Sequence, residues 1–219
     1  MEQKERRVDI YIPAGWCDTL PVLYLLHGIN GCEQSWQERG GVIDTLETMM
    51  TAGRCRPTML VMPDVNKWDF DVCSSGGKLW SCLFRYSSLT HEHVLEYAIS
   101  DLIDHIDSIY RATGTCILAG LSDGARISAN VANLRPERVS AVGLFSPVLH
   151  KEQLPANPDN STLNYHIYVG RNDIFYASSR RFHRRLNRLN RPHQLVIVPG
   201  THDWPVWRSS LADFLEQTQ

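Results

Sequence analysis

The sequence predicts an α/β fold with a mostly parallel central sheet and helices on both faces. Two observations lead to this prediction: strand-sized apolar runs alternate with segments of helical period, and most of these runs are continuous rather than alternating. Continuous apolar runs are typical of strands buried on both faces, and strands that alternate with helices pair in parallel. The 219 residues are predicted to form one domain, 1–219.

Seven strands are predicted. The first, Val8–Ile12, is short and is followed by Pro13, which suits an edge strand. The other six are apolar runs, in chain order 22–26, 58–62, 115–119, 141–145, 165–169 and 194–198.

Helices are predicted between the strands. Apolar residues recur at helical spacing over 42–50, 94–109, 174–190 and 204–216, and a further helix is expected from Ala125 onward. The segment 66–90 has no regular period. We interpret it as a long loop insertion over the sheet, of a kind that often shapes a binding site.

Composition and charge exclude several classes of protein. Apolar residues make up 43% and charged residues 21%, as in soluble globular proteins. The net charge of −2 indicates neither nucleic acid nor an anionic membrane as a partner, and the basic run 180–191 is interpreted as a solvated helix face. No apolar run is long enough to span a bilayer. The N-terminal residues lack the apolar core of a signal peptide, which favours a cytoplasmic location; a periplasmic or secreted protein whose leader was removed is the alternative.

The six cysteines form no C-x-x-C pair, so a structural zinc site is not expected. We expect free thiols in a reducing compartment, with a Cys73–Cys82 disulfide as the alternative. His91 and His93 flank Glu92, but we do not interpret them as a metal site. The predicted chemistry uses no metal and no cofactor.

The most specific motif is Gly120-Leu121-Ser122-Asp123-Gly124, which stands between an apolar run and a helical segment. This is the sequence context of a nucleophile elbow. The glycines allow a tight backbone crossing, and the helix N-terminus points at the developing negative charge. A plain Gly/Ser turn would have the same five letters, so the role of Ser122 depends on its partners.

Partners for Ser122 are expected at the carboxyl ends of later strands, where open parallel sheets bind ligands. Asp173 follows the run 165–169, and His202 follows the run 194–198. The order Ser122, Asp173, His202 is that of α/β-hydrolases. The histidine would accept the serine proton and return it to the leaving group, while the carboxylate fixes its tautomer. We therefore predict that these three residues form a catalytic triad.

A structural role remains the alternative for each partner taken alone. Asp173 could form a turn, and His202 could pack beside Trp204. Asp203 is a rival acid because it adjoins His202. We interpret Asp203 instead as the N-cap of the last helix, with Pro205 in its first turn.

An acyl-transfer site also needs two backbone N–H groups for the oxyanion. One is expected from Asp123, the residue after the serine. The other is expected from Ile29, in Leu-Leu-His-Gly-Ile-Asn-Gly (25–31), where Gly28 lets the backbone approach the substrate. We interpret His27 as a residue that stabilises this turn.

Together these motifs resemble the esterase D-like family of α/β-hydrolases. The resemblance extends from about Val8 to Leu215, and it includes the Leu-Leu-His-Gly-x-x-Gly, Gly-Leu-Ser-x-Gly and His-Asp-Trp motifs, the last at 202–204 with Trp207. The family includes S-formylglutathione hydrolases, tributyrin, feruloyl and acetylxylan esterases, and mycolyltransferases. The resemblance implies an α/β-hydrolase fold and ester chemistry.

Two positions depart from the family pattern. These esterases often have Met or Gln after the serine and a second Gly after the elbow, where this chain has Asp123 and Ala125. A carboxylate beside an oxyanion donor should oppose negative charge unless it points away or is paired.

Six tryptophans are many for this length. Trp36, Trp68 and Trp80 are predicted in loops around the site, and Trp204 and Gly28 are expected to contact substrate as well. Aromatic faces suit a phenolic acyl group or a sugar ring, with loop packing as the alternative.

We therefore predict a serine carboxylic ester hydrolase without a large cap domain, acting through an acyl-serine intermediate. The expected substrates are small acyl or hydroxycinnamoyl esters, including carbohydrate-linked ones. An acyltransferase of the same fold and a non-catalytic binding module are the alternatives. The sequence leaves a homo-oligomer open.

Overall fold

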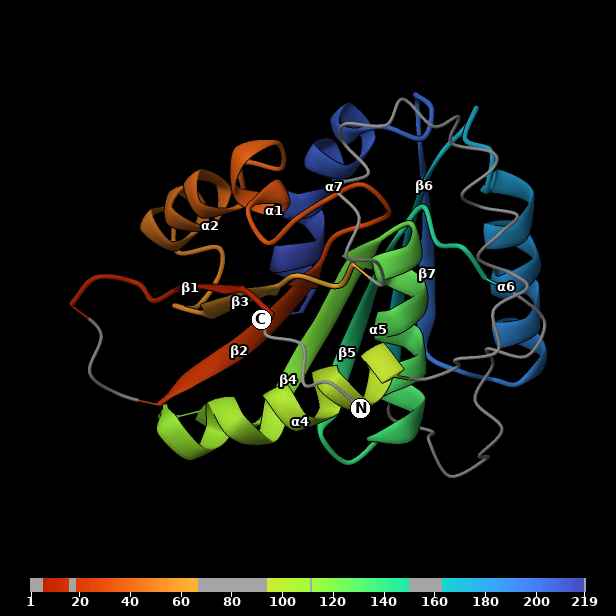
Figure 1. Cartoon of the computed structure of the whole chain (residues 1–219). Helices are drawn as coiled ribbons and strands as arrows, with labels where there is room; N and C mark the ends of the chain where they lie inside the picture. The colour runs from red at the N-terminus through yellow and green to blue at the C-terminus, as the bar shows by residue number, and fades with distance from the viewer. Residues whose placement is uncertain (1–5, 16–18, 67–93, 111, 150–162, 219) are drawn as a thin grey trace.

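A computed structural model describes residues 6–15, 19–66, 94–110, 112–149 and 163–218. Almost all of the predicted insertion, 66–90, lies outside the described residues. The fold is an α/β arrangement built on one seven-stranded sheet (Figure 1).

The sheet has the strand order β1-β3-β2-β4-β5-β6-β7. Strand β1 pairs antiparallel with β3 at one edge, and every other neighbouring pair is parallel. This confirms the predicted α/β class. The strands are β1 Val8–Tyr11, β2 Leu20–Leu26, β3 Met59–Pro63, β4 Ala112–Leu121, β5 Val139–Phe145, β6 Asn164–Gly170 and β7 His193–Val198.

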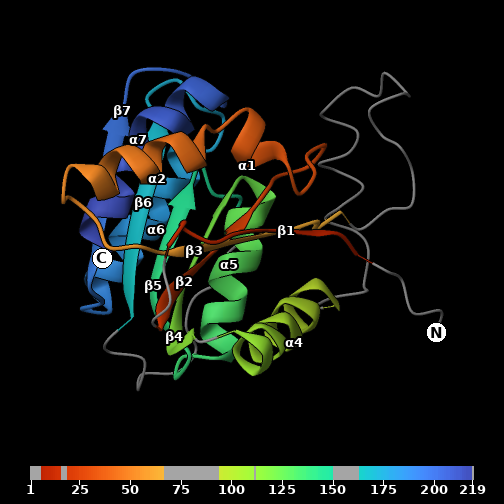
Figure 2. The same ribbon diagram turned by 90° about the vertical axis from the view of Figure 1, so that its left-hand side faces the viewer.

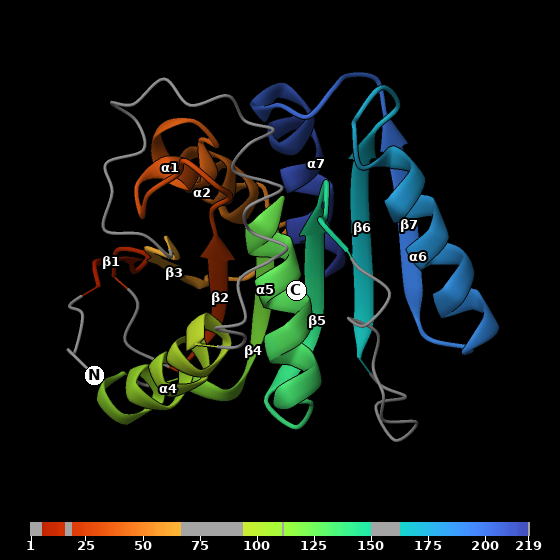
Figure 3. The ribbon, with the colours of Figure 1, turned by 45° about the vertical axis from the view of Figure 1, so that its right-hand side comes forward.

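Helices cover both faces of the sheet. In Figure 2, α4 and α5 lie on one side of the sheet, and α2 and α7 lie on the other. Figure 3 shows α4, α5 and α6 along the near face. The described helices are α1 Ser35–Glu38, α2 Val42–Thr51, α4 Val94–Ile109, α5 Asp123–Leu134, α6 Tyr176–Arg188 and α7 Trp204–Gln217.

Two apolar clusters, one on each face, hold these layers together. Along β2, Tyr24 belongs to the cluster under α4 and α5, while Leu23 and Leu25 belong to the cluster under α2 and α7. Successive side chains of a strand point to opposite faces, so a central strand needs apolar residues at every position. This is why the continuous apolar runs predicted the strands correctly.

The four-residue helix α1 was not predicted from the sequence. It is too short to show a helical period, and its place depends on tertiary contacts. Its Trp36 is 1% exposed, and the indole Nε1 donates to the carbonyl of Leu26 at 3.1 Å. The ring also packs edge-on against Phe145 and Trp204.

Helix α7 begins as predicted, with Asp203 at the N-cap and Pro205 in the first turn. The expected side-chain cap is absent from this helix. Instead, Asp203 Oδ2 accepts a hydrogen bond from the Thr201 hydroxyl at 2.9 Å, within the loop that precedes the helix.

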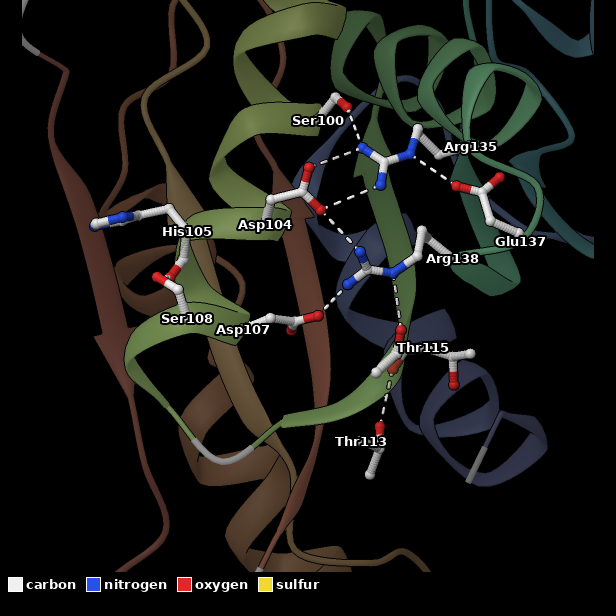
Figure 4. A network of polar contacts seen from close by, with 11 residues as sticks. Ser100, Asp104, His105, Asp107, Ser108, Thr113, Thr115, Arg135, Glu137 and Arg138 are labelled. Carbon is white, nitrogen blue, oxygen red and sulfur yellow. Dashed lines mark hydrogen bonds and ion pairs between the residues drawn. The ribbon is translucent and has the colours of Figure 1, made fainter.

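An exposed ion-pair network ties α4 to the loop between α5 and β5 (Figure 4). Arg135 bonds both carboxylate oxygens of Asp104, and Arg138 bonds Asp104 and Asp107. The network lies where β5 begins. It therefore lies at the amino ends of the parallel strands, whereas the predicted site lies at their carboxyl ends.

Cys32, Cys55 and Cys116 are free thiols, and burial raises the pKa of Cys116 to about 12. Cys17, Cys73 and Cys82 lie outside the described residues, as do His91, Glu92 and His93. Among the described residues, no cluster of three metal-binding side chains occurs. None of the described helices has the length and apolarity to cross a membrane.

Candidate active site

Ser122 stands on a strained turn between β4, which ends at Leu121, and α5, which begins at Asp123. Its φ of 54° and ψ of −114° lie in a region that L residues rarely adopt. Such a conformation costs about 1–3 kcal/mol and persists only where surrounding contacts hold it. Here the backbone N–H of Ser122 donates to Phe145 O at 2.8 Å, and its carbonyl accepts from Val148 N–H.

Two glycines permit the close backbone crossing at this turn. A Cβ on Gly120 would lie 2.4 Å from the Gly124 carbonyl carbon, and a Cβ on Gly124 would lie 2.4 Å from the carbonyl oxygens of Leu26 and His27. The first turn of α5 therefore presses directly on the end of β2. The glycines of the motif are required by space, as expected for a nucleophile elbow.

His202 and Asp173 are brought together by the pairing of β6 with β7. The register aligns Gly170 with Val198, so the loops after both strands leave the sheet side by side. His202 Nδ1 lies 3.1 Å from each carboxylate oxygen of Asp173. A carboxylate in this position selects the tautomer with hydrogen on Nδ1 and leaves Nε2 free to accept a proton.

The Asp173 carboxylate is buried and remains ionised. Burial alone would raise its pKa, but hydrogen bonds from His202, the Ser146 hydroxyl and the Phe175 N–H lower the pKa below its ordinary value. The Phe175 bond is 2.7 Å long. Ser146 in turn accepts a hydrogen bond from the indole of Trp207 at 2.9 Å.

The imidazole of His202 is held between two aromatic rings. Phe175 and Trp207 both pack edge-on against it, with ring centroids 5.1 and 5.2 Å away. These contacts restrict the ring to one orientation, which a general base needs in order to meet its proton donor.

Ser122 and His202 line the same cavity, of about 370 Å³. The first wall is the loop after β2, with Gly28 and Ile29 in it. The second wall is mostly apolar and comes from the loop after β6 and the first turn of α7, with Ile174, Phe175, Trp204, Pro205 and Trp207. This places the cavity at the carboxyl edge of the sheet, where parallel α/β sheets bind ligands.

The loop with the predicted oxyanion donor Ile29 lies against the elbow. A Cβ on Gly28 would approach Leu121 Cδ1 to 2.7 Å and Ser122 Cβ to 3.1 Å. A side chain at this position would crowd both Leu121 and Ser122, so the glycine favours this close approach of the loop to the serine. Ile29 lines the same cavity as Ser122.

His27 anchors this loop, in agreement with the structural role expected for it. It is 2% exposed, its Nδ1 lies 2.7 Å from Gly28 O, and its Nε2 accepts from the Val65 N–H at 2.9 Å. Its Nε2 also lies 3.1 Å from Asp64 Oδ1, so His27 contacts two residues of the segment after β3. The Asn66 amide adds a 2.7 Å bond to Gly31 O, so the segment after β3 supports the whole loop.

The carboxylate of Asp123 is paired and turned toward α4. Arg126 donates from Nε to Asp123 Oδ1 at 2.6 Å, and Arg126 is also bonded to Glu96 of α4 at 2.9 Å. The departure from the family pattern at Asp123 is therefore accompanied by a guanidinium partner one helical turn away.

Comparison with known proteins supports one family. The family model described as "Esterase: Putative esterase" matches residues 1–218. The chain belongs to this esterase family.

This esterase is similar to several characterised proteins. It is 28% identical over 153 residues to an endo-1,4-beta-xylanase/feruloyl esterase of Xylanibacter ruminicola, a match that covers 65% of this chain and 20% of that longer protein. Its fold matches a CE1 ferulic acid esterase from Anaeromyces mucronatus, solved with ferulic acid, with a TM-score of 0.74 and 21% identity over 97% of this chain and 85% of that one. It also matches an S-formylglutathione hydrolase of Staphylococcus aureus, with a TM-score of 0.70 and 16% identity over 97% and 90% of the two chains. These neighbours confirm the α/β-hydrolase fold.

Two of the four tryptophans in this esterase's predicted site, Trp204 and Trp36, lie in the described part of the chain, and they differ in their exposure to the cavity. Trp204 lines the cavity as expected, with the Arg39 guanidinium 5.2 Å from its ring centroid. The expectation that Trp36 contacts substrate is wrong, because its ring is enclosed between α1 and the sheet. Trp68 and Trp80 lie outside the described residues.

Four residues of the esterase site were missed as such by the sequence analysis. Ile174 and Phe175 follow Asp173 directly and could have been found from that position. Ser146 hydrogen-bonds Asp173, and Arg126 bonds Glu96, each across a long stretch of the sequence. Neither residue stands in a motif, so no sequence signal points to them.

Proposed function

We propose that this esterase hydrolyses carboxylic esters through an acyl-serine intermediate on Ser122. The observation that carries the proposal is the placement of a strained, glycine-flanked serine in one cavity with a histidine that is bonded to a buried carboxylate. Serine, base and orienting acid then have the arrangement that serine hydrolases use.

The proposed reaction uses only these residues and water. Ser122 Oγ attacks the ester carbonyl carbon while His202 Nε2 accepts the hydroxyl proton. Asp173 orients His202 and stabilises the imidazolium. The backbone N–H groups of Ile29 and Asp123 stabilise the oxyanion. His202 then protonates the leaving alcohol. In the second half of the reaction, water attacks the acyl-serine carbonyl while His202 accepts its proton, and His202 returns that proton to Ser122 Oγ as the acid leaves.

We further propose small acyl or hydroxycinnamoyl esters as substrates, including esters linked to carbohydrate. The cavity volume of about 370 Å³ suits a small molecule. The faces and edges of Phe175, Trp204 and Trp207 offer contacts that a phenolic ring would make. The feruloyl esterase similarity, distant as it is, supports the same class.

The experiment is hydrolysis of p-nitrophenyl acetate, butyrate and octanoate and of methyl ferulate by wild type and Ser122→Ala. Ser209→Ala is the matched control, because Ser209 lies on α7 and its hydroxyl bonds only to the carbonyl of Val206 among the interactions described. We expect wild type and the control to be active, and Ser122→Ala to lose orders of magnitude in rate.

A fluorophosphonate probe gives an independent readout, since only an activated serine reacts with it quickly. Labelling of wild type but not of Ser122→Ala is the expected result. An inert wild type that also escapes labelling would instead favour the non-catalytic binding module. Transfer of the acyl group to an added sugar in preference to water would favour the acyltransferase.

A further inference from the structure

A cluster of buried charged side chains lies beside the first turn of α5, outside the triad. It comprises Asp123 and Arg126 of α5 and Glu96 of α4, which are 5%, 8% and 1% exposed. We refer to these three residues as the buried ion cluster. Arg126 stands at its centre, with hydrogen bonds to Asp123 Oδ1 at 2.6 Å, Asp123 Oδ2 at 3.4 Å and Glu96 Oε1 at 2.9 Å.

The cluster joins two helices along one line of contact. Asp123 and Arg126 are three residues apart on α5 and so share a helix face. Asn130, one turn further, faces the same way and donates to Glu96 Oε1 at 2.9 Å. Burial alone would raise the pKa of Glu96, but the Asn130 hydrogen bond and the Arg126 charge lower it below its ordinary value. Glu96 is therefore an anion at neutral pH.

Stability alone does not account for such a cluster. Removing charges from water is costly, and well-packed apolar side chains in place of a buried ionic group are often as stable or more so. The position of the cluster suggests another role. Asp123 follows the nucleophile, and its backbone N–H is an oxyanion donor in the proposed mechanism.

The charge on Asp123 is a problem for that mechanism. A carboxylate near the oxyanion would raise the energy of the transition state, in which negative charge develops on the substrate oxygen. The pairing with Arg126 offsets this charge and draws the carboxylate toward α4. Among the described residues, Leu121 and Ser122 line the cavity and Asp123 does not.

We propose that Arg126 and Glu96 are positioning residues for the oxyanion hole. Arg126 holds and neutralises the Asp123 carboxylate on the α4 side, and Glu96 holds Arg126 in place, so that the Asp123 N–H alone faces the reacting carbonyl. This inference rests on the proposed acyl-serine mechanism, and it adds α4 to the elements that shape the site.

The test compares Arg126→Met, Asp123→Asn and the double variant in the full chain. Arg126→Met leaves the Asp123 charge without its guanidinium partner, so we expect kcat for p-nitrophenyl acetate to fall about tenfold or more, with KM changed less than about twofold. Asp123→Asn removes the charge at nearly constant shape, and its kcat is the reference value for the double variant.

The double variant decides the proposal. Because the opposing charge is gone, kcat of the double variant should return to within about threefold of the kcat of Asp123→Asn. Glu96→Gln should lower kcat less than Arg126→Met does, and Asp123→Asn should rescue it in the same way. Affinity for phenylboronic acid, which binds serine hydrolases as a tetrahedral anion, should follow kcat through the series.

Two results would overturn the inference: a folded Arg126→Met with the kcat of wild type, or a double variant as slow as Arg126→Met. If Arg126→Met does not fold, Arg126→Lys takes its place, with a smaller loss that Asp123→Asn must again rescue. Failure of the proposed function itself would look different, because wild type would then turn over no ester and escape fluorophosphonate labelling.

Discussion

Replacing Gly124 with alanine tests how the elbow is held against the sheet. Gly124 lies in the first turn of α5, and an added Cβ would lie 2.4 Å from both Leu26 O and His27 O. Those oxygens belong to the backbone at the end of β2, a central strand paired on both sides. They cannot rotate away as a flexible side chain could.

The size of the effect follows from these distances. A carbon and a carbonyl oxygen approach to about 3.3 Å in close packing, so the helix and the loop after β2 must separate by roughly 0.9 Å. Overpacking of this kind costs about 1–3 kcal/mol of stability, reduced by up to about 1 kcal/mol because alanine favours helix over glycine. Displacement of catalytic groups by about 1 Å can cost about 100-fold in rate. We therefore expect a large loss of activity with a small loss of stability.

The assay is kcat/KM for p-nitrophenyl acetate together with urea unfolding. Ala132→Gly is the control, because Ala132 is fully buried on the same helix but two turns beyond the elbow. It should cost about 1–2 kcal/mol through lost helix propensity and lost burial. Its kcat/KM should stay within about twofold of wild type, since the Ser122 turn is untouched.

Two outcomes would refute this reasoning. If Gly124→Ala kept wild-type kcat/KM, the close contact between α5 and the end of β2 would not determine the geometry of the site. If both variants lost activity in proportion to their stability, the loss would reflect unfolding rather than displacement of Ser122 from the loop with Ile29.

Two further predictions concern the acid and the cavity wall. Because the pKa of Asp173 is lowered in the folded state, its ionised form adds stability above its ordinary value of 3.8, and this is lost as the pH falls through the folded pKa. The difference in unfolding free energy between wild type and Asp173→Asn should therefore be greatest at pH 7 and should shrink as the pH falls below 3.8. Urea unfolding of both proteins at pH 7 and below pH 3.8 measures this difference. A difference that does not change with pH would contradict the lowered pKa. Trp204→Ala should raise KM for methyl ferulate several-fold more than KM for p-nitrophenyl acetate, because the acetyl group is too small to contact the indole. Equal effects on the two substrates would show that Trp204 does not contact the aromatic acyl group.

The sequence alone determined the fold class, most of the elements and the candidate triad. Central strands of a parallel sheet are buried on both faces, so they are apolar at every position and can be recognised locally. The carboxyl ends of such strands meet at one edge, which is why Asp173 and His202 could be placed together without coordinates. The elbow was recognisable because its glycines are required by a local backbone crossing.

The tertiary structure alone decided which side chains pair across long stretches of the chain. Glu96 and Arg126 are 30 residues apart, and His27 and Val65 are 38 apart, yet these contacts support the two predicted oxyanion donors. The same is true of Trp36, which the sequence placed beside the substrate and the packing of α1 buried instead. Periodicity and motifs report the local environment of a residue, whereas the direction and partner of a side chain depend on how whole elements pack against one another.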